Sequence, residues 1–455
     1  MAINKHHKKL SLLLLLFIVG SAFKPAGKTD TILFTHVTFI DGNGGKPLDN
    51  ADVLVKGNTI AAIGKNLKAN GARIVDLKGK TMMPALISDH VHVGLIHGPN
   101  DKTNPYTRNK IVSELKKYES YGVGTIMVMG TDRPIMFDGG IRDSSMAELL
   151  PGARLHSAGY GFGMPAGAPP VEMGMTNVYR PSSVAQIPSE MDSLVLVKPD
   201  LVKLWIDDFG GKYKSKMSPA IYKSIIGEAH KRDLRVAAHV FYLSDVRQLI
   251  NDGVNIIAHS IRDSVIDDAL VQKMKVNHVV YIPTLSLDEY AYIYARKPDW
   301  INDPFFKVSL EPGVYELITS GKYQNDLKNS PAYAKNMAAF NIALKNLKKI
   351  FDAGVLVCLG TDSGAMMLRA QGFSEHLELE LMVQAGLTPL QALTVATKNS
   401  SEMLHIEKQF GTLQKGKIAD FIILDGNPAM DIKNTRKILA VYKSGIQVSK
   451  GPLSN

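Results

Sequence analysis

Eight short and largely apolar segments follow one another along the middle of the chain, and helical patterns separate most of them. The segments are residues 85–93, 124–130, 153–160, 200–207, 235–240, 255–260, 278–284 and 355–362. Near-continuous apolar strands joined by helices indicate a parallel sheet that is buried on both faces. Their number and succession favour a closed (β/α)8 TIM barrel over an open doubly wound sheet. No G-x-G-x-x-G loop follows the first segment, as a dinucleotide-binding fold would require.

The two ends of the chain have a different pattern, in which short β-rich runs alternate with turn residues. These runs are residues 31–40, 51–64, 72–83, 417–428 and 438–448. Valine, isoleucine and threonine with turns between them predict an antiparallel sheet. We therefore expect a small β-sandwich domain formed by residues 30–83 and 408–455, beside a barrel that spans residues 84–407.

Residues 286–339 depart from the alternation of strands and helices, and they are rich in Tyr, Pro, Asn and Lys. We expect a long, partly helical excursion over the mouth of the barrel. A passive surface insertion and a functional lid are equally compatible with this composition.

The first 22 residues have the three-part pattern of a secretory signal peptide. A basic start, MAINKHHKK, is followed by the apolar run LSLLLLLFIVG and then by small residues near Ala22. The apolar run is shorter than the roughly 20 residues that a bilayer span needs, so an uncleaved anchor is the lesser interpretation. The sequence thus predicts an exported protein, periplasmic or secreted, without a stable membrane anchor.

The formal net charge is +10 over 455 residues, and Lys5, Lys8 and Lys9 of the predicted signal peptide contribute to it. The remaining basic residues are scattered, without a dense Lys/Arg run and interleaved aromatic residues. This distribution argues against a nucleic-acid partner. Cys358 is the only cysteine, so an internal disulfide cannot form, and its apolar surroundings predict a buried core residue.

Ionisable side chains lie at the carboxyl ends of several predicted strands. They are His90, His92, Lys203, His239, His259 and Asp362. His90 and His92 point the same way, because side chains at i and i+2 of a strand share a face. In a barrel these strand ends meet at one mouth, where active sites of this fold are built. An unpaired charge in such an apolar setting is costly, so we expect a metal site made mostly of zinc-type ligands.

Lys203 is the unexpected member of this set, because an ammonium group repels a metal ion. Burial favours the neutral amine. A neutral amine can add carbon dioxide and become a carbamate, whose carboxylate is able to bridge two cations. Two other interpretations remain open: the six residues are satisfied core groups, or the site holds a single metal and Lys203 pairs with an acid.

The ordered set H-x-H, Lys, His, His, Asp resembles the amidohydrolase superfamily, and more narrowly its binuclear members near imidazolonepropionase and the prolidase-like amidohydrolases. The similarity runs from about Thr31 to Val448 and includes GKTMMPALI, AGLTPLQALTVATKNSSEMLHI and GTLQKGKIADFIILDGNP. The family usually shows Pro-Gly-Leu-Ile-Asp before H-x-H. Here Ser88 holds the usual aspartate position, and Asp89 follows one place later, facing the opposite way on a regular strand. The difference concerns the support of the first strand rather than the metal ligands.

The resemblance implies a metal-dependent hydrolase with two divalent cations, expected to be zinc. One cation would be held by His90, His92 and Asp362 and the other by His239 and His259, with carbamylated Lys203 and a hydroxide between them. The resemblance further implies that the hydroxide attacks an amide or peptide carbonyl, while Asp362 acts as general base and then general acid. The same hydroxide would serve esters, lactones or phosphotriesters, and a metal-binding scaffold without turnover is the non-enzymatic alternative.

Substrate contacts are less constrained by the sequence. Tyr242 and Arg262 each lie three residues beyond a predicted ligand, and an arginine at the mouth can hold a carboxylate through two hydrogen bonds. This suits a dipeptide or an N-acyl amino acid as the small-molecule substrate, and a cyclic amide is the further substrate class expected of such a hydrolase. The structural alternatives are packing of Tyr242 on the barrel rim and pairing of Arg262 with Asp263 or another acid. His97 is a further candidate for the mouth. His376 is expected to cap a helix or face solvent, with a substrate contact as the alternative, and a homo-oligomer is left open.

Overall fold

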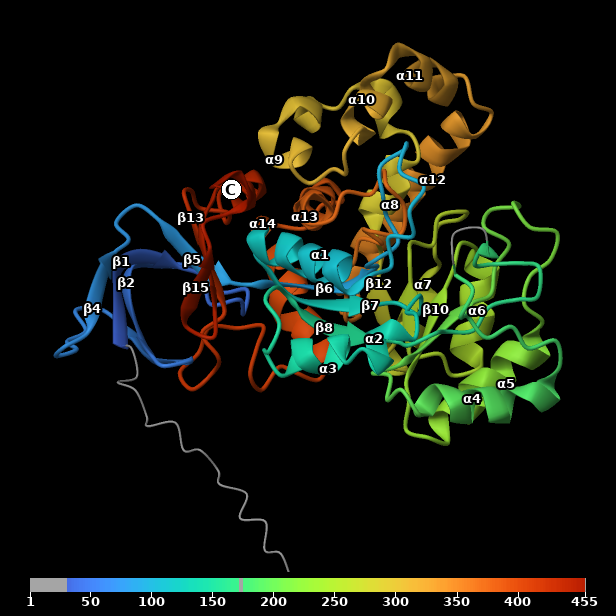
Figure 1. Cartoon of the computed structure of the whole chain (residues 1–455), viewed down its shortest axis with the longest axis horizontal. Coiled ribbons are helices and arrows are strands. Elements are labelled where there is room, and N and C mark those ends of the chain that lie inside the picture. Colours follow the sequence, from blue (N-terminus) through green and yellow to red (C-terminus); the bar gives the residue numbers. More distant parts are fainter. Residues whose placement is uncertain (1–30, 172–174, 455) are drawn as a thin grey trace, which may run out of the picture.

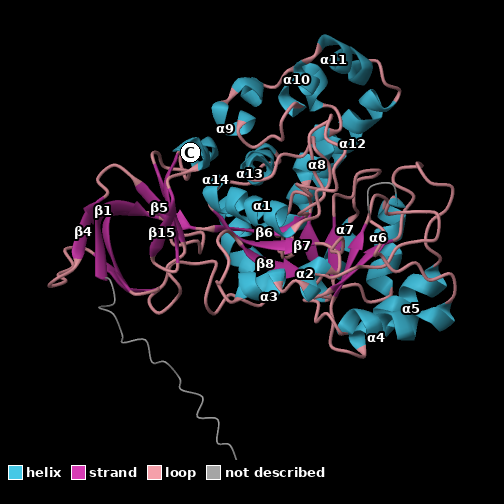
Figure 2. Cartoon of the chain, viewed as in Figure 1, coloured by secondary structure: helices cyan, strands magenta, loops and turns pink. Residues whose placement is uncertain are grey.

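The computed structural model describes residues 31–171 and 175–454, so the predicted signal peptide lies outside the described residues. The fold is mixed α/β (Figure 1), with two parallel sheets in the middle of the chain and a larger sheet built from both chain ends (Figure 2). The parallel sheets contain β6 (Leu86–Val91), β7 (Val123–Val128) and β8 (Arg154–Ser157) in one, and β9 (Val202–Trp205), β10 (Val236–His239), β11 (Ile256–Ala258) and β12 (Val280–Ile282) in the other.

Single β-bridges join the two parallel sheets into a ring of paired segments. The bridging pairs are Phe162–Leu204, Tyr281–Val357 and Val91–Ser363. The segment predicted as the eighth strand, residues 355–362, thus pairs with β12 on one side and β6 on the other without forming a continuous strand. Asp362 has a φ of +57°, which interrupts the extended backbone of this segment. The arrangement is TIM-barrel-like, while the complete (β/α)8 barrel stays a prediction.

Helices surround the parallel strands, and capping residues explain where several of them begin. The helices are α1 (Arg108–Ser120), α2 (Ile135–Asp138), α3 (Ile141–Met146), α4 (Ile187–Val195), α5 (Pro219–His230), α6 (Leu243–Asn251), α7 (Asp268–Val276), α12 (Ala332–Asp352), α13 (Phe373–Gln384), α14 (Pro389–Thr394) and α15 (Ser400–Met403). The side chains of Thr107, Ser218 and Asp267 each accept a hydrogen bond from a backbone N–H in the first turn of α1, α5 and α7. Such caps satisfy donors that the helix itself leaves unpaired.

The larger sheet draws its strands from both chain ends. They are β1 (Thr31–Phe39), β2 (Leu48–Lys56), β3 (Thr59–Gly64), β4 (Arg73–Asp76), β5 (Thr81–Pro84), β13 (Phe421–Leu424), β14 (Ile438–Lys443) and β15 (Ile446–Ser449). β5 is the junction, because it pairs in parallel with β1 and antiparallel with β13. Phe34 packs edge to face on Phe421 and Tyr442, with ring centroids 5.3 and 5.2 Å away. The two ends therefore share one sheet and one apolar core, while the division into a β-sandwich domain stays a prediction.

The predicted excursion is helical over most of its length. It contains α8 (Leu285–Tyr290), the 3₁₀ turns η3 (Ile293–Arg296) and η4 (Asp299–Asn302), and then α9 (Pro304–Lys307), α10 (Val314–Thr319) and α11 (Gly321–Lys328). In Figure 1, α9, α10 and α11 lie at the top of the view, while α8 lies beside α13. Among the helices that the structure describes, none has the length and apolar character to cross a membrane.

Candidate metal centre

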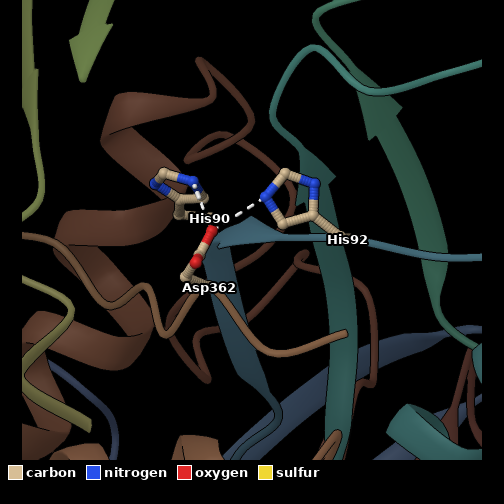
Figure 3. Close-up of side chains that lie close together, drawn as sticks. All are labelled: His90, His92 and Asp362. Atoms are coloured by element: carbon tan, nitrogen blue, oxygen red, sulfur yellow. Dashed lines mark hydrogen bonds and ion pairs between the residues drawn. The ribbon is translucent and has the colours of Figure 1, made fainter. Parts of the chain in front are cut away.

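Two histidines and an aspartate meet at the end of β6. Nε2 of His92 lies 2.8 Å from Oδ1 of Asp362, and Nε2 of His90 lies 3.2 Å from the same oxygen. All three side chains are buried, and Figure 3 shows both imidazole rings directed at the carboxylate. Within residues 31–171 and 175–454, they are the one group of three His, Cys, Asp or Glu whose ligand atoms all lie within 4.8 Å of one another. The pairing of segment 355–362 with β6 brings these residues together.

Asp362 is held in its ionised form by its neighbours. Burial acts to raise the pKa of this carboxyl, but the charge of Arg369 and the hydrogen bonds from His90 and His92 outweigh it and hold the pKa of Asp362 well below its ordinary value. Nη1 of Arg369 contacts Oδ2, whereas Oδ1 faces the two histidines. Sequence reasoning missed Arg369, because it lies in the loop after the eighth segment and no periodic pattern marks it.

Lys203 lies on β9 and is completely buried. Its Nζ has no hydrogen-bond partner among the described residues. Burial lowers the pKa of Lys203 to about 7, although the charges of Asp362 and Asp207 oppose this shift. A large share of this amine is therefore neutral near pH 7, unlike an exposed lysine, which is almost fully protonated there.

His239 ends β10 and His259 follows β11, so neighbouring strands deliver both rings to the same place. Their ring centroids lie 4.2 Å apart, and the ring of His259 lies 4.5 Å from that of His90. Burial is the main cause that lowers the pKa of His239 and of His259, and nearby positive groups, Lys203 among them, add to the effect. Both rings are therefore neutral near pH 7, which is the form that can bind a metal.

Threonines at two further strand ends orient the histidines. Nδ1 of His92 lies 2.6 Å from Oγ1 of Thr131, and Nδ1 of His259 lies 2.9 Å from Oγ1 of Thr284. These contacts fix each ring while leaving Nε2 toward the cluster, as in protein metal sites whose ligands are held by outer partners. Sequence reasoning missed both threonines. Thr131 follows β7 and Thr284 follows β12. Neither carries the ionisable side chain that marked the other strand ends in the sequence.

Asp207 is a further residue that sequence reasoning missed. It is completely buried, and its Oδ1 lies 3.5 Å from Nε2 of His239. Burial acts to raise the pKa of Asp207, but His239 and the backbone N–H of Phe209 hold it below its ordinary value. Asp207 directly follows an apolar strand, which is the signal that identified the other residues.

The donor set fits divalent cations. The structure brings together four imidazoles, one ionised carboxylate and a buried amine, and imidazole and carboxylate are ligand types that zinc and similar metals accept. Buried polar atoms are normally hydrogen-bonded. Nζ of Lys203 and both ring nitrogens of His239 lack such a bond among the described residues, although Nε2 of His239 lies 3.5 Å from Oδ1 of Asp207, so these atoms are available to a ligand. All six residues predicted from the sequence lie in this one cluster.

Ser88 and Asp89 have different surroundings. Oγ of Ser88 donates a hydrogen bond to Oε1 of Glu375 on α13, 3.2 Å away. Asp89 is also fully buried, and burial raises its pKa well above the ordinary value against the effects of Ser400, Arg235 and Cys358. The pairing of β6 with β7 is irregular between Ser88 and Val91. The strict alternation assumed for a regular strand therefore does not run from Ser88 through to His90.

A cavity of about 320 Å³ opens onto the cluster. Its lining includes His92, His239, His259 and Asp362, the arginines Arg262 and Arg369, and the aromatic residues Trp205, Phe209 and Phe241. These groups give a pocket with apolar walls and two guanidinium groups beside the metal centre.

The two predicted substrate contacts lie in different places. Arg262 lines the cavity, and its Nη1 lies 2.7 Å from Oδ1 of Asp288, a neighbouring acid of the kind expected as the structural alternative. Tyr242 does not belong to the lining. Its hydroxyl donates to Oδ1 of Asp208 at 2.9 Å, and Nζ of Lys216 lies 3.6 Å from its ring centroid. The substrate contact predicted for Tyr242 stays a prediction.

Two further histidines that the sequence singled out lie away from the cluster. His97 lines an adjoining cavity that shares Ala365 and Met366 with the one above. His376 was expected to cap a helix or face solvent, but it is completely buried. Its Nδ1 lies 3.0 Å from Oγ1 of Thr435 and its Nε2 lies 2.9 Å from the carbonyl oxygen of Tyr121. The expectation fails because segments distant in the sequence cover α13.

Comparisons with known proteins agree with this geometry. A model of the amidohydrolase family matches residues 81–448. The ochratoxinase of Aspergillus niger is 28% identical over 243 residues, 52% of this chain and 42% of that protein, so the match spans less than half of this relative. A 5'-deoxyadenosine deaminase of Methanothrix thermoacetophila is 22% identical over 84% of this chain and 83% of that protein. Among solved structures, a Xaa-Pro dipeptidase with bound methionine superimposes with a TM-score of 0.73 at 20% identity, covering 92% of this chain and 99% of that one.

Proposed function

This chain belongs to the amidohydrolase family, and on that premise we propose that it is a metal-dependent hydrolase that cleaves a C–N bond of the amide or peptide kind in a small substrate. The observation that carries the proposal is the meeting of His90, His92 and Asp362 beside the unpartnered amine of Lys203. Buried neutral nitrogen donors around one ionised carboxylate favour metal-assisted hydrolysis over a purely structural role.

We propose that two divalent cations, of which zinc suits the donors, occupy the cluster. One would be held by His90, His92 and Asp362, the other by His239 and His259, and Lys203 would serve both as a carbamate. The lowered pKa of Lys203 supports this, because only the neutral amine adds carbon dioxide. Bound cations of this kind lower the pKa of water and polarise a carbonyl oxygen. Thr131 and Thr284 would keep their histidines in the binding orientation.

Asp362 is the residue that we propose to move the proton. Its carboxylate is ionised, lies in the wall of the cavity and is within reach of a substrate there. It would accept a proton from the attacking water and then deliver that proton to the departing nitrogen. A positioned general acid and base of this kind contributes about 10²–10⁴-fold to a rate. Arg369, which contacts Oδ2, would hold the carboxylate in place.

The lining of the cavity supports a substrate with a free carboxylate and an apolar body. Arg262 and Arg369 offer guanidinium groups, and Trp205, Phe209 and Phe241 offer flat apolar surface. We therefore propose an N-acyl amino acid or a dipeptide as the substrate class. The similarity to a structure titled Xaa-Pro dipeptidase is compatible with this choice. The same residues could instead hydrolyse an ester or a lactone, and assays on both kinds of substrate distinguish this alternative from amide hydrolysis.

We also propose that residues 1–22 are removed on export and that the protein acts in the periplasm or outside the cell. The basic and apolar pattern of this segment supports the proposal. Intact-mass measurement of the protein purified from its native host tests it, since cleavage near Ala22 would shorten the chain by this segment. We further propose that residues 30–83 and 408–455 form a β-sandwich domain beside the barrel.

A metal count and a hydrolysis panel test the main proposal. The purified protein is stripped with a chelator, reloaded with zinc in the presence of bicarbonate, and counted by plasma mass spectrometry. It is then assayed on dipeptides, N-acyl amino acids, cyclic amides and lactones. We expect two zinc ions per chain and turnover of the carboxylate-bearing amides. If the protein binds two metal ions but hydrolyses no substrate of the panel, the proposal of a hydrolase is wrong and the protein is a metal-binding scaffold.

A further inference from the structure

A second cavity, of about 810 Å³, adjoins the helical excursion, and α8 separates it from the metal centre. Leu287 of α8 lines the first cavity, whereas Glu289 of the same helix lines the second. The other walls come from η4, from α13 and from η6 (Ile432–Arg436). In Figure 1, α8 and α13 lie side by side below the rest of the excursion. None of the proposed metal ligands lines this second cavity.

The lining of the second cavity carries an excess of acidic side chains. The acids are Glu289, Asp299, Asp303, Glu380 and Asp431, and the bases are Lys433 and Arg436. Arg436 is already engaged, because its Nη2 lies 2.5 Å from Oε1 of Glu380 and its Nη1 lies 3.3 Å from Oδ2 of Asp303. Lys433 is the one other base of the lining, against Glu289, Asp299 and Asp431, so the lining keeps an excess of negative charge.

Glu289 is the acid of this cavity that most clearly lacks a positively charged partner. It is 7% exposed, and its Oε2 has no hydrogen-bond partner among the described residues. Burial and the negative charge of Glu380 raise the pKa of Glu289 to about 7, although Arg436 opposes them. A buried carboxylate without a partner is costly, and a cation that donates hydrogen bonds removes most of the cost.

Trp300 determines which kind of cation suits the cavity. Its ring is fixed by packing on Phe306 and Phe373, with centroids 4.7 and 5.0 Å away. An aromatic ring beside carboxylates favours an organic cation, which gains from the ring face, over a bare metal ion, which needs several oxygens at once.

We propose that this second cavity binds an organic ammonium ion, a protonated amine on an alkyl chain, with the ammonium group at Glu289 and the chain along Trp300. Leu377 and Leu381 of α13 supply apolar surface for the chain. The ammonium group donates a hydrogen bond to Oε2 of Glu289, which has no hydrogen-bond partner among the described residues. The site is separate from the metal centre and binds a ligand of opposite charge to the carboxylate substrate.

Isothermal titration calorimetry on the whole protein tests this site, with 1,5-diaminopentane as the probe, sodium pentanoate as an anion of similar length, and calcium chloride as a metal. We expect the diamine to bind, and pentanoate and calcium not to bind at this site. Glu289→Gln should weaken diamine binding at least tenfold, because the neutral amide cannot pair with the ammonium group. Glu316→Gln removes one exposed acid from α10 of the same excursion, outside the lining, and should leave the affinity unchanged.

The melting temperature of each variant confirms that it is folded. If Glu289→Gln does not fold, Asp299→Asn serves in its place, because Asp299 is an exposed residue at the rim and its loss should weaken binding severalfold. No diamine binding by the unaltered protein, or equal binding by Glu289→Gln and the unaltered protein, would overturn the proposal. If the protein binds calcium but not the diamine, and Glu289→Gln loses the calcium binding, the cavity is a metal site and not an ammonium site.

Discussion

Ser88 of β6 donates a hydrogen bond across 3.2 Å to Oε1 of Glu375, a residue of α13. The same oxygen accepts hydrogen bonds from Thr361 at 2.7 Å and Ser363 at 3.0 Å, the two neighbours of Asp362. Glu375 therefore joins the first strand to the eighth segment directly behind the metal centre. At the position where the resemblance to the amidohydrolases leads us to expect an aspartate, this chain has Ser88, which faces an acid from α13.

Ser88→Asp should destabilise the protein, although it restores the residue usual in the family. The substitution would place a second carboxylate against Glu375 in a fully buried setting, where like charges cannot both ionise cheaply. We expect a loss of about 3–5 kcal/mol in the free energy of unfolding, the scale of an uncompensated buried charge. Urea denaturation followed by circular dichroism measures it. The double variant Ser88→Asp with Glu375→Gln should regain part of this loss, and a double variant as unstable as the single one would contradict the explanation.

Asp362→Asn should remove turnover while leaving much of the metal bound. The amide keeps the shape and one oxygen donor but cannot accept the proton, so we expect kcat to fall about 10²–10⁴-fold. The metal content should remain close to that of the unaltered protein, because the histidine ligands are untouched. Steady-state kinetics on the best amide substrate and a parallel metal count check both statements. Turnover at the original rate would show that Asp362 is not the general base.

Lys203 predicts a pH dependence of stability in the metal-free protein. Its pKa is about 7 when folded and about 10.4 when unfolded. Between these values the unfolded chain binds one more proton, so the free energy of unfolding rises with pH by up to about 1.4 kcal/mol per unit. In Lys203→Met the free energy of unfolding should not show this rise with pH, because methionine does not titrate. Urea titrations of both proteins at pH 7.5, 8.5 and 9.5, in chelator and without carbon dioxide, compare the slopes, and equal slopes would contradict the prediction.

Arg262 should matter for substrates that carry a carboxylate. Replacing it alone would strand Asp288, its buried partner at 2.7 Å, so the variant of choice is Arg262→Met with Asp288→Asn. We expect kcat/KM for an N-acyl amino acid to fall about 10–100-fold, the scale of one charge-assisted hydrogen bond. The corresponding N-acyl amino acid amide, without the carboxylate, serves as the control and should be hydrolysed at nearly the same rate by both proteins. Equal losses on the two substrates would indicate a structural role.

The sequence indicated the cluster because each proposed ligand lies within or directly after an apolar run. His239 and Lys203 stand out as ionisable residues within or directly after buried runs, and such positions are costly without a function. Arg369 and Glu375 offered no comparable signal. Arg369 lies in a loop. Glu375 has the pattern of an ordinary acid on a helix, and only the folded structure shows that α13 packs behind segment 355–362. Contacts between residues far apart in the chain, such as Ser88 with Glu375, depend on the fold itself.

The fold class followed from the alternation of strands and helices, but the details of the eighth segment did not. Residues 355–362 are as apolar as the other strands, and yet this segment forms isolated bridges, at Val357 and at the adjacent Ser363, rather than a continuous strand. The left-handed backbone of Asp362, with a φ of +57°, is a local conformation that turns its carboxylate toward His90 and His92. Such conformations are costly for residues other than glycine and concentrate at functional sites. Hydrophobic patterns cannot reveal them.

The position of β5 between β1 and β13 has a consequence for the order in which the molecule is assembled. During synthesis, β5 leaves the ribosome long before β13, so one edge of β5 stays unpaired while the whole barrel is made. Exposed strand edges invite pairing with other chains, and contacts between distant parts of a chain form slowly. A fragment that ends before β13 would keep every ligand of the metal centre and still lack the partner of β5. Aggregation, rather than loss of the metal ligands, is the expected fate of such a fragment.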